Sequence, residues 1–138
     1  MTASLGCIII EDEPLAMEKA RGFVGKIPDL KVLSTFDNAL DGLTYLRSNK
    51  VDILFLDINM DELSGIELLE THSVQSQIIF TTAYSEYALR GYELNVTDYL
   101  LKPYSFARFV QAVNKAQENI KQLKNTVSQD YILSLIHI

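Results

Sequence analysis

Short apolar segments recur along the chain and alternate with segments in which apolar residues repeat every three or four positions. This change from a period of two to a period of about 3.6 predicts β-strands alternating with α-helices. Because each interval leaves room for a helix, the alternation is typical of a parallel sheet built from crossover units. The predicted strands are Leu5–Ile10, Lys31–Phe36, Val51–Leu56, Gln77–Thr81 and Asp98–Leu101.

The composition of these strands indicates their places in the sheet. Continuous apolar runs such as Cys7–Ile10 and Ile53–Leu56 are typical of central strands covered on both faces. Lys31–Phe36 is more mixed and Asp98–Leu101 is short, so we expect these two strands at opposite edges. The predicted fold class is therefore α/β, with a five-stranded parallel sheet.

Each interval between strands also contains a residue suited to a helix start. Pro14 fits a first helical turn, because its φ is fixed and its missing N–H is not needed there. Asn38, Ser85 and Ser105 are expected as N-caps. The predicted helices run from about Pro14 to Ile27, Ala39 to Leu46, Gly65 to Leu69, Ser85 to Glu93 and Phe106 to Asn125.

Residues 126–138 do not continue the apolar pattern of the last helix. Asp130–Leu133 is compatible with the opening of a strand. We expect residues 1–125 to form one domain, and residues 126–138 to be a linker or the start of a truncated output domain. A cloning or sequence-assembly tail is the alternative for Ser134–Ile138.

Length and charge limit the number of domains and the class of partner. A chain of 138 residues and 15.6 kDa fits one ordinary domain. The net charge of −6 has the wrong sign for direct binding to DNA phosphates. The single Cys7 cannot form an internal disulfide. Without a leader or an apolar run near roughly 18 residues, the sequence predicts a cytoplasmic protein that does not enter a membrane.

Polar residues cluster where the predicted strands end. In open parallel sheets, ligands bind beyond the carboxyl ends of the strands, so these residues are expected to converge on one rim. The clusters are Glu11–Glu13, Asp57–Asn59, Thr81–Ala83 and Lys102–Pro103.

The acidic residues of this rim predict a magnesium site. Carboxylates within about 6 Å of one another repel, so one takes up a proton or a cation settles among them. Mg²⁺ prefers oxygen ligands, which Asp12, Asp57 and the main-chain carbonyl of Asn59 can supply. The acidic triplet Glu11–Glu13 alone is better explained as a solvated loop before a helix. Asp57 shifts the balance towards a metal site.

Asp57 is the candidate nucleophile, because it closes a very apolar strand where its carboxylate is partly desolvated and held rigidly. Such a carboxylate can attack phosphorus when a metal and a cation neutralise the phosphoryl oxygens. Lys102 is the candidate cation, since Pro103 keeps it extended. Thr82 is a candidate hydroxyl donor. Each residue alone also fits an ordinary strand end, but together they form a consistent constellation.

Over roughly Leu5 to Lys121, the chain resembles the receiver domain of bacterial two-component response regulators. The resemblance implies a flavodoxin-like doubly wound sheet with the strand order 2-1-3-4-5 and helices on both faces. The stretches that carry it, in the order and spacing of the family, are Ile8–Glu13, Leu54–Met60, Ile79–Ala83 and Asp98–Pro103.

A finer resemblance concerns the segment after the fourth strand. Phe80–Tyr84 followed by Glu86–Ala88 is most similar to the LytTR subgroup, whose receivers precede a DNA-binding output domain. This similarity implies a transcription regulator that contacts DNA only through a domain absent from this chain.

The family resemblance implies that Asp57 accepts a phosphoryl group from the phosphohistidine of a sensor histidine kinase. Asp12, Asp57 and the Asn59 carbonyl would bind Mg²⁺, with Glu11 helping through bound water. Lys102 would pair with the phosphoryl group. The domain would be a phosphoacceptor that catalyses its own phosphorylation and dephosphorylation, not a turnover enzyme.

The resemblance also implies how the signal leaves the site. Thr82 would move to contact the phosphoryl group, and Tyr99 would turn inward behind it. This movement would alter the face formed by the fourth helix, fifth strand and fifth helix, through which a homodimer is also expected. Asn59 and Tyr84 would tune how fast water removes the phosphoryl group.

Two positions depart from the family pattern. Glu11 stands where Asp is commoner, although its longer arm still reaches a metal through water. Asp61 stands where receivers often have Pro, and it adds a negative charge near the site.

Other classes of protein fit less well. A stand-alone receiver acting through a protein partner is the nearest alternative. In a phosphohydrolase of the haloacid-dehalogenase type, the nucleophilic Asp ends the first strand, whereas Asp57 ends the third. A receiver that has lost phosphorylation would not need Asp12, Asp57, Thr82 and Lys102. A flavin-binding protein would place a phosphate against Glu11–Glu13, which would repel it.

Overall fold

Five parallel strands form one sheet in the order β2-β1-β3-β4-β5. The computed structural model describes residues 4–136, with side chains described as far as residue 125. The predicted fold class and strand order are confirmed, and the two strands expected at the edges are β2 and β5. The strands are β1 (Leu5–Ile10), β2 (Leu30–Phe36), β3 (Ile53–Asp57), β4 (Gln77–Thr82) and β5 (Asp98–Leu101).

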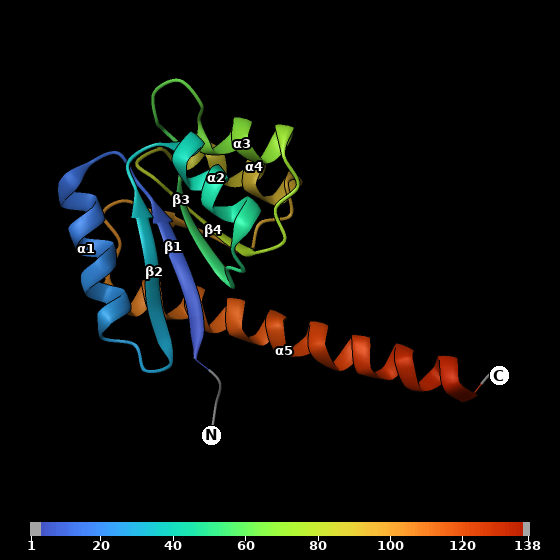
Figure 1. Ribbon diagram of the computed structural model, residues 1–138. Coiled ribbons are helices and arrows are strands. Elements are labelled where there is room, and N and C mark those ends of the chain that lie inside the picture. The colour runs from blue at the N-terminus through green and yellow to red at the C-terminus, as the bar shows by residue number, and fades with distance from the viewer. Residues whose placement is uncertain (1–3, 137–138) are drawn as a thin grey trace.

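Helices cover both faces of the sheet (Figure 1). Helices α1 and α5 pack on one face, and α2, α3 and α4 lie on the other. A short 3-10 helix, Ser85–Tyr87, precedes α4. The α-helices are α1 (Pro14–Gly25), α2 (Ala39–Ser48), α3 (Gly65–Thr71), α4 (Ala88–Glu93) and α5 (Phe106–Ile136).

The central strands divide their side chains between two cores. On β1, Cys7 and Ile9 pack with α1 and α5, whereas Ile8 and Ile10 pack with α2 and α3. Successive side chains of a strand point to opposite faces, so a strand buried on both faces must be apolar at every position. This requirement explains the continuous apolar run of β1, and the same holds for β3.

Polar side chains fix the starts of three helices. The Asn38 side chain accepts a hydrogen bond from the Asp41 backbone N–H at the start of α2. Ser64 and Glu67 form a capping box at α3. The Ser105 hydroxyl accepts from the Arg108 backbone N–H at 3.1 Å. These bonds satisfy backbone donors that have no partner within the helix.

The structure corrects several predicted boundaries. The first helix ends at Gly25 rather than Ile27, and the Ser85 side chain caps neither the 3-10 helix nor α4. Helix α5 continues to Ile136, beyond the expected end near Asn125, so Asp130–Leu133 is helical and opens no strand. The chain contains no Gly or Pro after Pro103, and so nothing in the sequence interrupts this helix.

Candidate functional site

Strand register brings the acidic residues together at the carboxyl ends of the strands. Ile10 pairs with Leu56, so the residues that follow, Glu11 and Asp57, lie on neighbouring strand ends. The side chains of Glu11, Asp12 and Asp57 each place a carboxylate oxygen within 4.8 Å of the others. Among residues 4–125, no other group of three or more His, Cys, Asp and Glu side chains is arranged in this way.

Asp57 is buried at the end of β3, with only 3% of the residue exposed. The Asn59 backbone N–H donates a hydrogen bond to its Oδ1 at 3.2 Å. Burial, a hydrogen bond with Glu11 and the charge of Glu11 raise the pKa of Asp57 to about 8, while the Lys102 charge opposes this increase. The cluster therefore holds more negative charge than its one cation balances.

Lys102 reaches the same cluster from the end of β5. Its ammonium lies 2.7 Å from Glu11 Oε1 and 3.6 Å from Asp57 Oδ1. Burial lowers the pKa of Lys102, but the hydrogen bond to Glu11 and the charges of Asp57 and Glu11 outweigh burial and raise it overall. Lys102 therefore remains protonated and supplies a permanent positive charge at the site. The peptide bond between Lys102 and Pro103 is cis.

Thr82 ends β4 and is completely buried. Its hydroxyl donates towards Asn59 Oδ1 at 3.5 Å and accepts from the Tyr84 backbone N–H at 3.2 Å. The Tyr99 hydroxyl in turn donates to the Tyr84 backbone carbonyl. A line of hydrogen bonds thus joins the loop after Asp57 to Tyr99 on β5.

The residues of the cluster fit a hard divalent cation. When all three carboxyl groups are ionised, the one ammonium leaves two negative charges unbalanced. Asp12 is exposed, so the cluster is open to solvent on its side. All the donors are oxygens, as Mg²⁺ prefers, and the single Cys7 is fully buried in the core. The structure thus brings Glu11, Asp12, Asp57 and Lys102 together at one rim. Asn59 and Thr82 are hydrogen-bonded beside them, and Tyr84 and Tyr99 are connected to Thr82 by further hydrogen bonds. The roles of all these residues stay predictions.

Two features of the site were not predicted. One is the close pairing of Lys102 with Glu11, which depends on side-chain reach across the sheet. The other is Gly65, the first residue of α3. A Cβ atom at Gly65 would lie 2.6 Å from the Asp57 backbone oxygen, so the glycine lets α3 begin directly against β3. A glycine immediately after the Ser64 cap was the only sequence signal for this approach.

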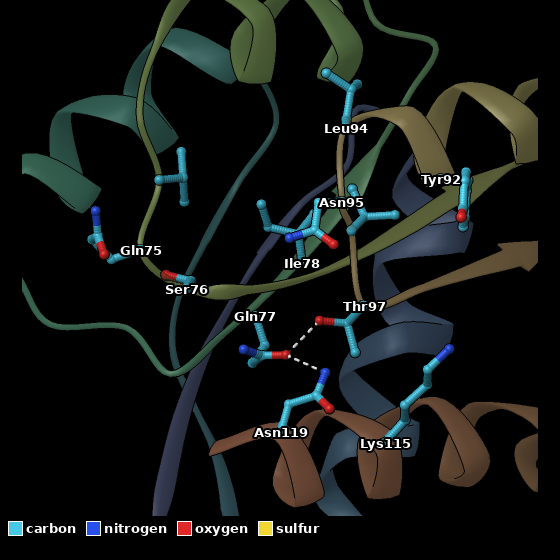
Figure 2. A pocket seen from close by; sticks show the side chains of 12 residues that line it. Gln75, Ser76, Gln77, Ile78, Tyr92, Leu94, Asn95, Thr97, Lys115 and Asn119 are labelled. Carbon is cyan, nitrogen blue, oxygen red and sulfur yellow. Dashed lines mark hydrogen bonds between the residues drawn. The ribbon is translucent and has the colours of Figure 1, made fainter. Parts of the chain in front are cut away.

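A second hollow lies at the opposite end of the sheet (Figure 2). This cavity of about 520 Å³ is lined by the start of β4, by the segment that precedes β5, and by α5. Gln77 Oε1 accepts hydrogen bonds from the Thr97 hydroxyl and the Asn119 amide, at 2.6 and 2.9 Å. None of the predicted site residues lines it, so it forms no part of the acidic site.

Apolar side chains are exposed on the face formed by α4 and β5. Leu89 and Tyr92 of α4 and Leu101 of β5 are all solvent-exposed. This face adjoins Tyr99 and is the one expected to carry the signal.

Among residues 4–136, no helix combines the length and apolar character needed to cross a membrane.

Comparison with known protein families gives one match to most of the chain. A sequence profile described as "Response regulator receiver domain" matches residues 7–114. MrkE of Klebsiella pneumoniae is 36% identical over 124 residues, which cover 88% of this chain and 46% of MrkE. The transcriptional regulatory protein LytR of Staphylococcus aureus is 36% identical over 138 residues, covering 93% of this chain and 56% of LytR. The chain thus spans about half the length of these relatives.

Solved structures agree with this match. The response regulatory domain of Klebsiella pneumoniae mrkE superposes with a TM-score of 0.78 at 35% identity, covering 86% of this chain and 99% of that one. The REC domain of AraT, a response regulator from Geobacillus stearothermophilus, has a TM-score of 0.73 at 28% identity, covering 87% of this chain and 98% of that one.

Proposed function

The chain belongs to the family of response regulator receiver domains, and on this premise we propose that Asp57 accepts a phosphoryl group from a sensor histidine kinase. Receiver domains are phosphoacceptor switches rather than classical enzymes, and they generally interact with histidine kinases. The observation that supports this role is the position of Asp57. The residue is 3% exposed, yet its carboxylate borders two other carboxylates and lies 3.6 Å from the Lys102 ammonium.

In the proposed reaction, an Asp57 oxygen forms a bond to phosphorus as the bond from phosphorus to the histidine nitrogen breaks. The electron pair of the broken bond stays on the imidazole, which takes up a proton. Catalysis of this kind consists mainly of positioning and charge stabilisation. Asp57 is positioned by β3 and by the Asn59 N–H, and the Lys102 ammonium is placed to pair with a phosphoryl oxygen. We propose that the domain catalyses both its phosphorylation and its dephosphorylation in this way.

Receiver domains bind Mg²⁺ at an acidic pocket, which here is the cluster of Glu11, Asp12 and Asp57. We propose Asp12, Asp57 and the main-chain carbonyl of Asn59 as ligands, with Glu11 acting through water. When bound, the ion neutralises negative charge on the phosphoryl oxygens. The protein residues hold the acceptor oxygen of Asp57 in place.

The proposed switch uses the hydrogen bonds by which Thr82 and Tyr99 each contact the main chain of Tyr84. A phosphoryl group on Asp57 offers new acceptors to the Thr82 hydroxyl, which would leave Asn59 and the Tyr84 N–H to reach them. Tyr99 would then give up the Tyr84 carbonyl and turn inward. The phosphoryl group shifts the population towards the state with which it makes more contacts.

The proposed output is a DNA-binding domain of the LytTR type outside this chain. The full-length relative LytR is named a transcriptional regulatory protein, and this chain matches about half of it. The exposed apolar residues of α4 and β5 support a homodimer through the face of α4, β5 and α5. A stand-alone receiver with a protein partner is the second candidate. Asn59 and Tyr84 flank the site, and we propose that they set the rate of dephosphorylation. The proposed location of the protein is the cytoplasm.

Acetyl phosphate with Mg²⁺ tests the proposal directly. Mass spectrometry should detect one added phosphoryl group on the wild-type protein and none on Asp57→Asn. Asp52→Asn is the matched control, because Asp52 precedes β3 at the other end of the same strand and an Asn there still offers Gly6 an acceptor. Phosphorylation of Asp57→Asn would contradict the proposal, and sustained hydrolysis of phosphate esters by the wild type would favour a phosphohydrolase.

A further inference from the structure

The ammonium of Lys102 is closer to Glu11 than to the proposed phosphoacceptor. The distances are 2.7 Å to Glu11 Oε1 and 3.6 Å to Asp57 Oδ1. The first is a charge-assisted hydrogen bond, whereas the second is longer than any hydrogen bond. Both carboxylates are almost fully buried, so the attraction of each to Lys102 is only weakly screened. In this state, Glu11 is the principal partner of Lys102.

Glu11 is itself held in place from two sides. Its backbone N–H donates to the Phe36 carbonyl at 2.9 Å, which anchors the end of β1 against β2. Its second carboxylate oxygen, Oε2, accepts from the Glu13 backbone N–H at 3.2 Å. The Glu11 side chain therefore presents Oε1 to Lys102 from a fixed position. An Asp at this position would have an arm shorter by one methylene group and would not reach as far.

The backbone of Lys102 is also fixed, so only its side chain can move. The Lys102 N–H donates to the Thr82 carbonyl at 2.7 Å and joins the ends of β5 and β4. Its side chain is 19% exposed and has both carboxylates within 4.0 Å. The ammonium can therefore pass from one carboxylate to the other by rotations of the lysine side chain alone.

We propose that Glu11 is a positioning residue that holds Lys102 back from Asp57 until a divalent cation enters the acidic cluster. Lys102 and the cation compete for the negative charge of Glu11, so Lys102 leaves Glu11 as the cation binds and becomes free to meet a phosphoryl group on Asp57. This inference rests on the proposed function, because it concerns the readiness of that same site. It makes metal loading and the placement of Lys102 a single coupled event.

The test follows the ¹⁵N resonance of the Lys102 ammonium in the whole chain, assigned by its loss in Lys102→Ala. In wild-type protein, Mg²⁺ should shift this resonance with the same midpoint as the backbone amides of Asp57 and Asn59. Glu11→Gln should move the resonance before any Mg²⁺ is added. Glu11→Asp retains the charge but shortens the arm, and it should give an intermediate position.

Glu13→Gln is the matched control, because it removes a neighbouring exposed charge without removing the direct partner of Lys102. It should leave the metal-free resonance close to that of wild type. The proposal is overturned if Mg²⁺ saturates the Asp57 and Asn59 amides without moving Lys102. It is equally overturned if the resonance in both folded Glu11 variants matches wild type.

Mass spectrometry of wild-type protein treated with acetyl phosphate distinguishes a failure of this inference from a failure of the proposed function. If acetyl phosphate labels Asp57 but the Lys102 resonance does not respond to Mg²⁺, only the role of Glu11 fails. If no phosphoryl group is added while Lys102 responds to Mg²⁺, the phosphoacceptor function fails and the coupling stands. The wild-type titration needs no variant, so a Glu11 variant that does not fold cannot obscure the result.

Discussion

The metal-free protein disfavours the ionised form of Asp57. The carboxyl lies at the end of a buried strand beside Glu11 and Asp12, and Lys102 is engaged mainly by Glu11. Burial and the neighbouring acid raise the pKa of Asp57 from 3.8 to about 8. The same surroundings that favour the proposed role of Asp57 therefore reduce the stability of the metal-free domain.

The stability of the metal-free protein should consequently fall as the pH rises. Because the folded pKa of Asp57 lies above its unfolded value, the cost is absent below about pH 4, grows up to about pH 8 and is complete above it. Asp57→Asn should remove this cost and raise the free energy of unfolding by more than about 1 kcal/mol at about pH 9. Urea unfolding with a chelator measures the effect.

Added Mg²⁺ should flatten the same pH dependence in wild type, because a bound cation offsets the carboxylate charge. Asp52→Asn again serves as the control and should keep the wild-type slope. An Asp57→Asn protein that loses stability with pH as steeply as wild type would show that other groups cause the slope.

Gly65 should tolerate no side chain. In Gly65→Ala, the new Cβ would lie 2.6 Å from the Asp57 backbone oxygen, so α3 or the end of β3 must shift. Such overpacking typically costs about 1 to 3 kcal/mol. Thermal unfolding should show the loss, and the phosphorylation rate should fall because Asp57 moves. Gly22→Ala on α1 meets nothing within 4 Å and should raise stability by about 0.5 to 1 kcal/mol. Equal effects of the two substitutions would rule out this steric argument.

Among the elements, β5 and α5 share an apolar core and are also hydrogen-bonded by one arginine. Arg108 of α5 donates two hydrogen bonds to the Asp98 carboxylate, at 2.8 and 2.9 Å, and one to the Tyr99 carbonyl at 3.0 Å. These bonds fix the strand that carries Tyr99 to the helix beside it. Burial raises the pKa of Asp98, but the bonds from Arg108 and the Tyr99 N–H lower it below its ordinary value.

Arg108→Ala should therefore weaken the protein mainly near neutral pH. An Asp with a lowered folded pKa contributes stability above its unfolded value near 3.8, and this contribution disappears as the pH falls through the folded value. The loss should be about 1 kcal/mol, since the pair is partly exposed and screened by solvent. Arg90→Ala removes exposed ion pairs with Glu70 and Glu93 and should have a smaller effect. Identical acid unfolding curves for wild type and Arg108→Ala would contradict this role.

The elements predicted best from the sequence are those whose pattern of apolar residues follows from their burial. The apolar runs of β1 and β3 follow from burial on both faces, and the mixed run of β2 follows from its place at an edge. Helix α5 was predicted to end too early, because its apolar stripe covers only the part of the helix that packs on the sheet. Residues 121–125 are exposed, and the helix continues after that contact has ended (Figure 1).

The site residues were predictable as a set because parallel strands end at one edge. Their pairing was not predictable, since the preference of Lys102 for Glu11 depends on side-chain lengths and register. The prediction that Ser85 caps the fourth helix was wrong for a similar reason. Ser85 is a favourable cap in composition, but the chain forms a 3-10 turn there and the serine side chain caps nothing.

On the scale of the whole molecule, the proposed switch requires a change at the acidic site to reach the face of α4, β5 and α5. Beryllofluoride, a phosphoryl mimic, added with Mg²⁺ should change the ring resonances of Tyr99 in NMR spectra. Lys102→Ala should still bind Mg²⁺, because the three carboxylates remain, but its Tyr99 response should be weaker. Unchanged Tyr99 resonances in wild-type protein would contradict the proposed switch.

Tyr84 takes part in the line from Thr82 to Tyr99 only through main-chain atoms, its N–H and its carbonyl. Its ring is about half exposed and contributes nothing to that connection. Another side chain at position 84 could therefore change the proposed rate of dephosphorylation while these main-chain hydrogen bonds are kept. Proline at position 84 would remove the N–H that Thr82 accepts, and so would break this connection.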